Sequence, residues 1–277
     1  MKKIGPAQTR VLILAFIVFC GMSRAGDLRA QSPNLSGIAH VAFRVNDLEK
    51  SRDFYKTLGF EQAFAFSDAG KTSTAFIKIN DHQFIELYPR TSDSQPGSLL
   101  HTCFEAADLQ SVRTAYLAQG LQPTEIKKAR AGNLLFVMHD PEGHLLEYTQ
   151  YLPDSLHSQT QGKFLEDRRI STRLLAATAG VKDLEAERAF YMTKLAFKES
   201  APGSSKLYPA GDPDNEVQLQ SASDKPRIVF STADLKATAR DLRSRGFQPQ
   251  KGHAAISITD PDGAIVEFTS LRRALAK

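Results

Sequence analysis

The stretch HDPEGHLLEYTQY, residues 139–151, joins a turn to an apolar segment that contains one carboxylate, Glu147. Asp-Pro-Glu-Gly is typical of a tight turn, because proline fixes φ and glycine accepts a positive φ. A second copy, TDPDGAIVEFTSL, occupies residues 259–271, with Glu267 in the place of Glu147. A carboxylate that recurs in an apolar strand needs a partner, since burying an unpaired charge is costly.

Two further pairs of segments repeat along the chain. VNDLEKSRDFYKTLGFE at residues 45–61 matches VKDLEAERAFYMTKLAFKE at residues 181–199, and residues 104–123 match residues 230–249. Self-similarity on this scale indicates duplicated supersecondary units. After its first segment, the chain therefore consists of two similar halves.

Each half divides again into two units with the same order of elements. In the first unit, alternation of apolar residues predicts a strand at residues 38–45. Asn46 and Glu49 predict a capping box for a helix that ends at Gly59, and three strands follow. The second unit repeats this order with a helix over residues 108–119. We predict an α+β fold of four β-α-β-β-β units.

Four side chains occupy equivalent places in the first half. His40 and His101 lie in the first strands of their units, and Glu86 and Glu147 lie in the last strands at equal separations. Two units related by pseudo-symmetry would bring all four to one point. Imidazole and carboxylate ligands suit Zn, Ni, Co, Mn or Fe(II). We therefore predict a site for one divalent metal ion, whose identity the sequence does not specify.

Each of these residues also has a structural explanation. A single histidine in an apolar strand is commonly a core residue with satisfied hydrogen bonds, and a single glutamate commonly faces solvent at a sheet edge. Glu86 depends most on the strand register, since a slip by one residue turns its side chain outward. The recurrence of two histidines and two glutamates at matched places favours the metal site.

The second half lacks most of this set. The positions equivalent to the four candidate ligands are occupied by Ala176, Gln218, Arg227 and Glu267. We expect no metal there, and we expect Glu267 to pair with Arg227 or to face solvent. Only the pairing of the first unit with the second assembles a complete ligand set.

These units resemble the vicinal oxygen chelate superfamily, which includes glyoxalase I, fosfomycin-modifying thiol transferases, bleomycin-binding proteins and extradiol dioxygenases. The resemblance rests on the repeated units, on the ND(L)…FY…LGF helix at residues 46–60 and on the strand DPEGHLLEY at residues 140–148. It implies two cupped, mixed-sheet glyoxalase-like domains. These are a metal-binding domain at residues 37–151 and a degenerate domain at residues 170–271, joined by a linker at residues 152–169.

The resemblance also implies a chemistry. In metal-dependent glyoxalase I, a histidine or glutamine and a glutamate from each unit bind the metal, which is the pattern of His40, Glu86, His101 and Glu147. This implies a lyase or isomerase of glyoxalase type that acts on a small molecule with vicinal oxygens. Glu147 or Glu86 would act as general base.

Two alternatives remain. An Fe(II) ring-cleaving dioxygenase would use His40, His101 and Glu147, but Val137 stands where the tyrosine of that signature would fall. A non-catalytic small-molecule-binding protein of the bleomycin-resistance type needs no metal ligands, so the complete ligand set disfavours it.

The N-terminus predicts export. Lys2, Lys3 and Arg10 precede the uncharged run VLILAFIVFCGM, and small residues lead to Ala25 and Ala30. This pattern is typical of a secretory signal peptide, here residues 1–30, with cleavage after either alanine. The run is shorter than the ~20 residues of a membrane span. We expect a periplasmic or secreted protein without a stable membrane span, an uncleaved anchor being the alternative.

Charge and cysteine usage limit the partners. Residues 1–30 carry a net charge equal to the +4 of the whole chain, so the mature chain is near neutral. No basic patch with interleaved aromatic residues predicts nucleic-acid binding. Cys20 lies in the predicted signal, and Cys103 is expected to be a buried apolar residue. A small-molecule substrate is the expected partner, and a homodimer is compatible with the sequence.

Two histidines flank the turn that follows the third strand of the second unit. His139 and His144 lie on either side of the Asp-Pro-Glu-Gly sequence. We expect both on an exposed rim.

Overall fold

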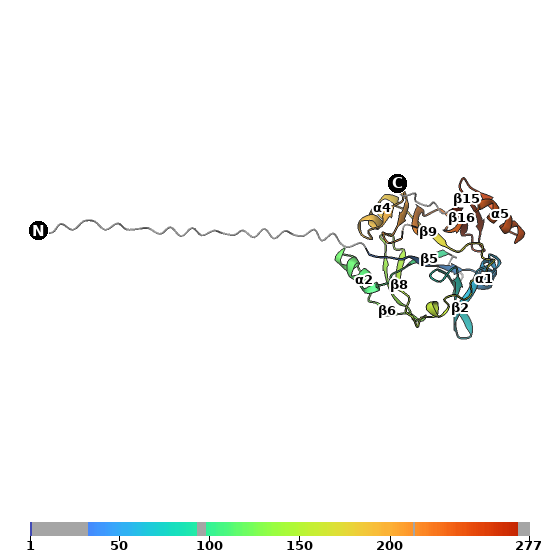
Figure 1. Ribbon diagram of the computed structural model, residues 1–277, viewed down its shortest axis with the longest axis horizontal. Helices are drawn as coiled ribbons and strands as arrows, with labels where there is room; N and C mark the ends of the chain where they lie inside the picture. Colours follow the sequence, from blue (N-terminus) through green and yellow to red (C-terminus); the bar gives the residue numbers. More distant parts are fainter. Residues whose placement is uncertain (2–32, 93–97, 213, 271–277) are drawn as a thin grey trace.

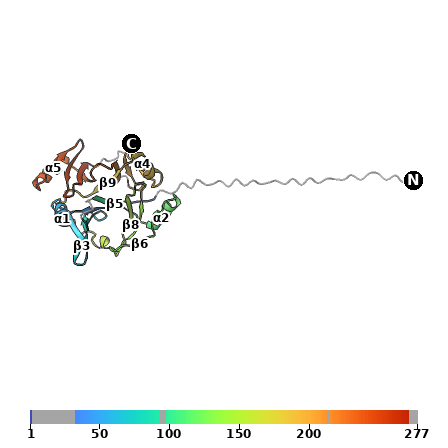
Figure 2. The ribbon, with the colours of Figure 1, turned by 180° about the vertical axis from the view of Figure 1, so that it is seen from behind.

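The computed structural model describes residues 33–92, 98–212 and 214–270, together with Met1. The chain forms two eight-stranded, mixed, curled sheets with interspersed helices (Figure 1). The first domain is blue to green in Figure 1 and lies against the second, which is yellow to red; Figure 2 shows the same arrangement from behind. The predicted signal peptide falls, apart from Met1, outside the described residues.

The first domain contains two β-α-β-β-β units. The first unit consists of β1 (Gly37–Val45), α1 (Leu48–Thr57), β2 (Glu61–Asp68), β3 (Lys71–Lys78) and β4 (Phe84–Pro89). The second consists of β5 (Ser98–Glu105), α2 (Leu109–Ala118), β6 (Lys127–Lys128), β7 (Leu134–His139) and β8 (Leu145–Gln150). The strands form one sheet in the order β2-β3-β4-β1-β5-β8-β7-β6. The short helix α3 (Leu156–Gln159) follows the second unit.

The second domain repeats this architecture. The third unit of the chain, the first in this domain, consists of β9 (Leu174–Val181), α4 (Leu184–Thr193), β10 (Lys198–Glu199), β11 (Lys206–Tyr208) and β12 (Glu216–Ser221). Its fourth consists of β13 (Arg227–Thr232), α5 (Leu235–Ser244), β14 (Gln250–Lys251), β15 (Ala255–Thr259) and β16 (Ile265–Ser270). The order β10-β11-β12-β9-β13-β16-β15-β14 matches that of the first sheet. The predicted four-unit α+β fold, with the first unit paired to the second, is confirmed.

Each ten-residue helix begins at an aspartate. The N-cap residues are Asp47, Asp108, Asp183 and Asp234, and each carboxylate accepts a hydrogen bond from a backbone N–H of the first turn. The predicted capping box of Asn46 and Glu49 is therefore wrong. The backbone of Asp47 is extended, which places its carboxylate over the N–H of Lys50 and leaves Asn46 outside the helix.

One hydrophobic core spans both domains. A single cluster of buried side chains includes Val41 of the first domain and Phe268 of the second. Two aromatic pairs cross the boundary at equivalent places: Phe60 stacks on Phe230 with centroids 5.3 Å apart, and Phe104 meets Phe197 edge-on at 5.4 Å. Large aromatic side chains contribute strongly to packing, so part of the core lies between the two domains.

Two buried amide side chains join the first strands of the domains. Gln83 donates to the carbonyl of Leu174 (3.0 Å) and accepts from its N–H (2.9 Å). Asn215 accepts from the N–H of Ile38 (2.9 Å) and donates to the carbonyl of Leu174 (2.7 Å). These bonds satisfy backbone groups that burial would otherwise leave unpaired.

The two Asp-Pro turns reach across the domain boundary in opposite directions. The Glu142 carboxylate accepts from the N–H groups of Lys182 and Asp183 at the start of α4, both at 2.7 Å. The Asp262 carboxylate accepts from the N–H of Asn46 before α1, also at 2.7 Å. Negative charge is favoured at a helix N-terminus. Each copy of the turn thus binds backbone N–H groups at or just before the N-cap of a helix in the other domain, which accounts for an acidic third residue in both.

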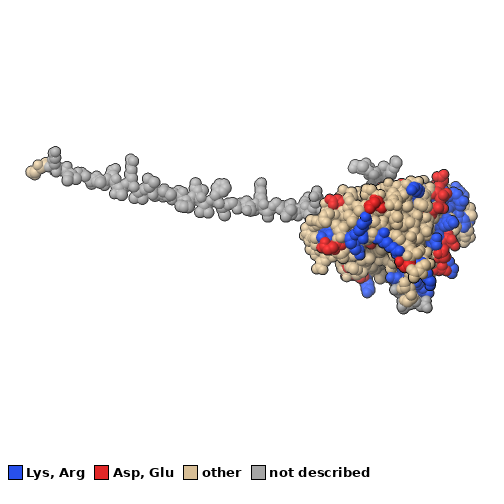
Figure 3. Space-filling model, turned by 90° about the horizontal axis from the view of Figure 1, so that it is seen from below, with Lys and Arg blue, Asp and Glu red and all other residues tan. Residues whose placement is uncertain are grey.

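The surface carries charge of both signs. On the face shown in Figure 3, basic and acidic side chains are interspersed. Within the described ranges, no helix is both long enough and apolar enough to cross a membrane.

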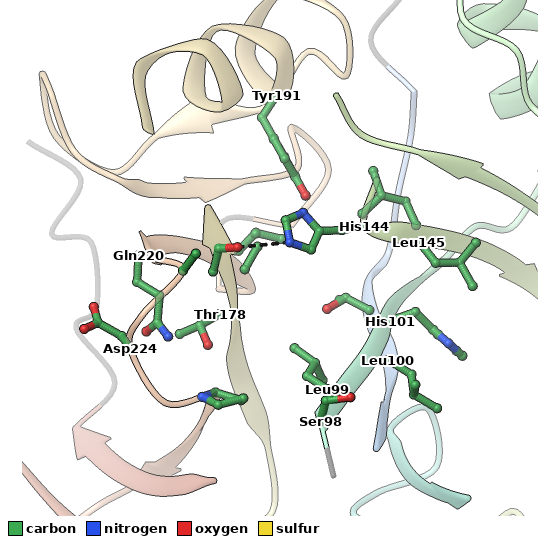
Figure 4. Close-up of a pocket in the computed structure, with 17 residues that line it drawn as sticks. Ser98, Leu99, Leu100, His101, His144, Leu145, Thr178, Tyr191, Gln220 and Asp224 are labelled. Atoms are coloured by element: carbon green, nitrogen blue, oxygen red, sulfur yellow. Dashed lines mark hydrogen bonds between the residues drawn. The ribbon is translucent and has the colours of Figure 1, made fainter. Parts of the chain in front are cut away.

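His144 adds a contact to one of the two turns. It is half-buried between the domains, whereas His139 is exposed; the expectation of an exposed rim is therefore wrong for His144. Its Nδ1 lies 2.7 Å from Oδ2 of Asp140. Its Nε2 lies 3.0 Å from the carbonyl of Gly180, a contact drawn as a dashed line in Figure 4. Both partners only accept, so the ring makes both bonds as an imidazolium. The Asp140 carboxylate raises the pKa of His144, and the second turn has Ala264 at this place.

A cavity of about 210 Å³ lies beside this contact. Leu99 and Leu145 line it from the first domain, and Thr178 and Gln220 line it from the second (Figure 4). The hydroxyl end of Tyr191 points toward the His144 ring. His144 therefore contacts the second domain at the edge of a cleft.

We expect His144 to stabilise the fold only at lower pH. Its folded pKa is raised, so its contribution is complete below the unfolded pKa of about 6.5 and is lost as the pH rises through the folded value. His144→Ala, which reproduces the second turn, should cost about 1 kcal/mol near pH 5, after allowance for partial exposure, and much less near pH 9. Urea unfolding of parent and variant at both pH values measures this.

Glu187, whose pKa burial raises to about 7, interacts electrostatically with His144, so the same comparison in a Glu187→Gln background separates the two groups. An equal cost of the substitution at both pH values would contradict the imidazolium assignment.

Candidate metal centre

Strand register places the predicted ligands on one face of the first sheet. Ala42 of β1 pairs with Glu86 of β4 and with His101 of β5. His40 lies two residues before Ala42, and residues two apart on a strand share a face. The possible one-residue slip of Glu86 does not occur, and Glu86 is buried.

The pairing of Cys103 shows that Glu147, the fourth predicted ligand, lies on the same face. Cys103 of β5 pairs with His40 on one side and with Glu147 of β8 on the other. All four predicted side chains therefore project from the central four strands of the sheet, β4, β1, β5 and β8.

The polar atoms of these side chains converge. Nε2 of His40 lies 3.1 Å from Nε2 of His101 and 3.5 Å from Oε1 of both Glu86 and Glu147. Nε2 of His101 lies 4.0 Å from Oε2 of Glu147. Ligand atoms bound to one ion at roughly 2.0–2.2 Å are separated by such distances. The structure thus brings all four residues together, and their binding of a metal stays a prediction.

Burial sets the charge state of the site. It lowers the pKa of His40 to about 3 and, with His40 nearby, that of His101 to about 4, so both rings are neutral, the form that binds metals. Burial raises the pKa of Glu86; burial and the charge of Glu86 raise the pKa of Glu147 to about 8. Neither carboxylate has a lysine or arginine ion-pair partner among the described residues. A divalent cation supplies the charge that this donor set lacks, so these residues fit a metal.

The two carboxylates have different neighbours. The hydroxyl of Tyr88 donates to Oε2 of Glu86 at 2.6 Å. Such outer contacts orient ligands. Tyr88 was not among the predicted site residues, although its position two residues after Glu86 on the same strand face is a usable signal. Glu147 has instead the Cys103 thiol beside it, so Glu86 is the more restrained of the two.

Cys103 is buried, as the sequence predicts, but it lies within the site. Its sulfur and ligand atoms of His40 and Glu147 lie within 4.8 Å of one another. Burial raises the pKa of the thiol well above its usual range, so it is not a thiolate nucleophile. Its counterpart in the first unit is Ala42, and the thiol therefore makes the two sides of the site unequal.

A cavity of about 400 Å³ reaches the two carboxylates. Apolar parts of its wall come from Phe66, Phe76 and Leu135. Arg130 also lines it, as does His157 of α3, a buried ring stacked on Tyr151 with centroids 4.4 Å apart. His157 lies in the predicted linker, where nothing in the sequence singles it out.

The equivalent face of the second sheet contains an ion pair. Ala176 of β9 pairs with Val229 of β13, as His40 pairs with Cys103. Nη1 of Arg227 donates to Oε2 of Glu267 at 2.6 Å. Of the two expectations for Glu267, pairing with Arg227 is the one observed.

Residues 37–148 match the model of the Glyoxalase/Bleomycin resistance protein/Dioxygenase superfamily. Among curated proteins, none matches this sequence.

Solved structures with the same fold include both metal-bound and ring-cleaving proteins. The Mn(II)-bound glyoxalase from Novosphingobium aromaticivorans is 16% identical, with a TM-score of 0.66 over 86% of this chain and 82% of that one. An extradiol ring-cleaving dioxygenase from B. fuscum is 16% identical, with a TM-score of 0.63 over 87% and 73%. The 2,3-dioxygenase LapB from Pseudomonas sp. KL28 is 14% identical, with a TM-score of 0.67 over 87% and 93%. Identities this low show the shared fold alone.

We expect the purified protein to bind about one divalent ion per chain, because only the first sheet assembles a ligand set. His101→Ala and Glu147→Gln should lower the bound metal severalfold. Elemental analysis after loading and desalting measures this. Glu267→Gln, the equivalent change in the second sheet, is the matched control and should leave metal content unchanged. Equal metal content in all variants would place the metal elsewhere.

We expect Tyr88→Phe to weaken metal binding by about tenfold, because loss of the hydroxyl frees Glu86 to rotate. Competition with a coloured chelator measures the affinity. Tyr151→Phe is the control, since the Tyr151 hydroxyl is buried without a partner among the described residues. Equal losses in both variants would show that Tyr88 acts only through packing.

Proposed function

Because residues 37–148 form a domain of the Glyoxalase/Bleomycin resistance protein/Dioxygenase superfamily, we propose that this protein is a divalent-metal-dependent lyase or isomerase of glyoxalase type. Its substrate is a small molecule with vicinal oxygens. The observation that carries the proposal is the convergence of two neutral imidazoles with the carboxylates of Glu86 and Glu147, both of which line one cavity. A protein that only packed these residues would leave the carboxylates unpaired.

A bound divalent ion would supply Lewis acidity toward a substrate carbonyl. His40 and His101 would hold it through Nε2, the atoms that face each other in the site. Glu86 would be a fixed ligand, because Tyr88 already restrains its carboxylate. These three residues would hold the ion to which the substrate binds, and they need not transfer a proton.

Glu147 is the residue that we assign to proton transfer. It lines the cavity and receives no hydroxyl hydrogen bond of the kind that Tyr88 gives Glu86. Its carboxylate would take a proton from the hydroxyl-bearing carbon next to the substrate carbonyl and return it to the carbonyl carbon, while the hydroxyl proton passes to the former carbonyl oxygen, so that the two isomers interconvert without a change in composition. The apolar wall of the cavity would limit the access of water to this step.

A second candidate is ring cleavage by an Fe(II) dioxygenase. His40, His101 and Glu147 alone form a set of two histidines and one carboxylate, which is the set that suits non-haem iron. Such an enzyme would not require Glu86. The two candidates therefore differ in their response to the loss of that residue.

We expect the metal-loaded protein to exchange the hydrogen next to the carbonyl of small 2-hydroxy aldehydes or ketones with deuterium from heavy water. Glu147→Gln should slow this exchange by about 100-fold or more, because the general base is lost. Mass spectrometry of the recovered compounds measures the exchange, and Glu267→Gln should behave like the parent.

Oxygen uptake with catechols by the Fe(II)-loaded protein is the opposing result. If Glu86→Gln retained that activity and no hydrogen exchange occurred in the parent, the dioxygenase would replace the isomerase.

A further inference from the structure

The two ends of the first sheet meet at the cavity. β2 and β6 are the outermost strands in the sheet order, and Arg130, after β6, reaches the end of β2. Its Nη1 donates to both carboxylate oxygens of Asp68, at 3.0 and 3.1 Å, and its Nη2 donates to the carbonyl of Ser67 at 3.0 Å. The guanidinium carbon lies 4.5 Å from the centroid of the Phe66 ring. Phe66, Asp68 and Arg130 all line the cavity.

The ion pair between Arg130 and Asp68 is weak enough for a ligand to replace Asp68 as the partner of Arg130. The two side chains are 53% and 65% exposed, and exposed ion pairs contribute little to stability. One nitrogen serves both oxygens of Asp68, so the two-nitrogen fork that binds a carboxylate best is not used. A carboxylate on a ligand can therefore replace Asp68 while the guanidinium stays stacked on Phe66.

Arg130 supplies the positive charge of the cavity wall. The other ionisable side chains that line the cavity within the described residues are Asp68, Glu86, Tyr88, Glu147 and His157. Glu86 and Glu147 would balance a bound divalent ion. Burial lowers the pKa of His157 to about 3 and keeps its ring neutral. An anionic group on a ligand thus has one cationic partner, and it stands at the exposed side of the cavity.

We propose that Arg130 determines specificity, by selecting ligands that carry a carboxylate at the end opposite their vicinal oxygens. This rests on the proposed function, since the vicinal oxygens are taken to bind at the metal centre. Phe76 pairs with Glu86 on the neighbouring strand, and Phe66 stacks on Arg130, so aromatic rings line the cavity beside both of its polar ends and suit a flat, apolar body. A cavity of about 400 Å³ accommodates a small molecule of this kind. The ligand class is a small carboxylic acid with an apolar or aromatic body and two adjacent oxygens.

Two probes with the same pair of adjacent hydroxyl groups test the role of Arg130. Catechol and 3,4-dihydroxybenzoate differ by a carboxylate, and both can be titrated without oxygen into the cobalt-loaded protein, with the visible absorption of cobalt as the readout. The parent should bind 3,4-dihydroxybenzoate about tenfold more tightly than catechol, because a charge-assisted hydrogen bond is gained. Arg130→Gln should remove this preference and leave catechol binding unchanged. Asp68→Asn should increase the preference, because the competing carboxylate is gone.

Lys128→Gln is the matched control. Lys128 forms an exposed ion pair with Asp154 and does not line the cavity, so the preference should persist. An equal preference in the parent and in Arg130→Gln would overturn the role of Arg130 while leaving the metal centre intact. Failure of the parent to bind cobalt, or of both probes to change its absorption, would overturn the proposed function and this inference with it.

Discussion

The burial of carboxylates on the inner faces of the two sheets is the constraint on which the rest of the structure depends. Glu147 and Glu267 occupy equivalent places in equivalent strands, where each is largely shielded from water and would be stabilised by a nearby positive charge. The second sheet provides it internally, through Arg227. The first sheet provides two neutral imidazoles and a second carboxylate, and neither carboxylate pairs with a lysine or arginine of the described residues. One architecture thus contains a face with an internal ion pair and a face with a set of candidate metal ligands.

The internal repeats explain why so much was predictable. Because the units match residue by residue, His40 and Glu86 could be paired with His101 and Glu147 before any geometry was known, and pseudo-symmetry then placed all four on one face. The same comparison offered Arg227 as one of two alternatives for Glu267, the other being exposure to solvent, and the structure shows the pairing. Local turn chemistry likewise predicted both Asp-Pro turns.

Residues that act across units could not be found in this way. Asp47 displaced Asn46 as the N-cap through a local backbone angle that residue preferences do not resolve. His144 and Arg130 owe their surroundings to segments far along the chain, the second domain and the end of β2. His157 follows no repeat at all, since it lies between the two halves. Comparison of repeats predicts only residues that have counterparts in another unit, and the contacts of these residues have no counterpart.

The crossed turns have a consequence for the chain as a whole. Glu142 and Asp262 each bind backbone N–H groups at the start of a helix of the opposite domain, and Gln83 and Asn215 each bind the backbone of the opposite domain in the same reciprocal way. These are the contacts of an isologous dimer, in which each patch faces its own copy. Here both partners belong to one polypeptide. A substitution in a symmetric dimer appears twice, whereas in this chain it appears once, so one half can retain a metal-ligand set while the other holds an arginine in its place.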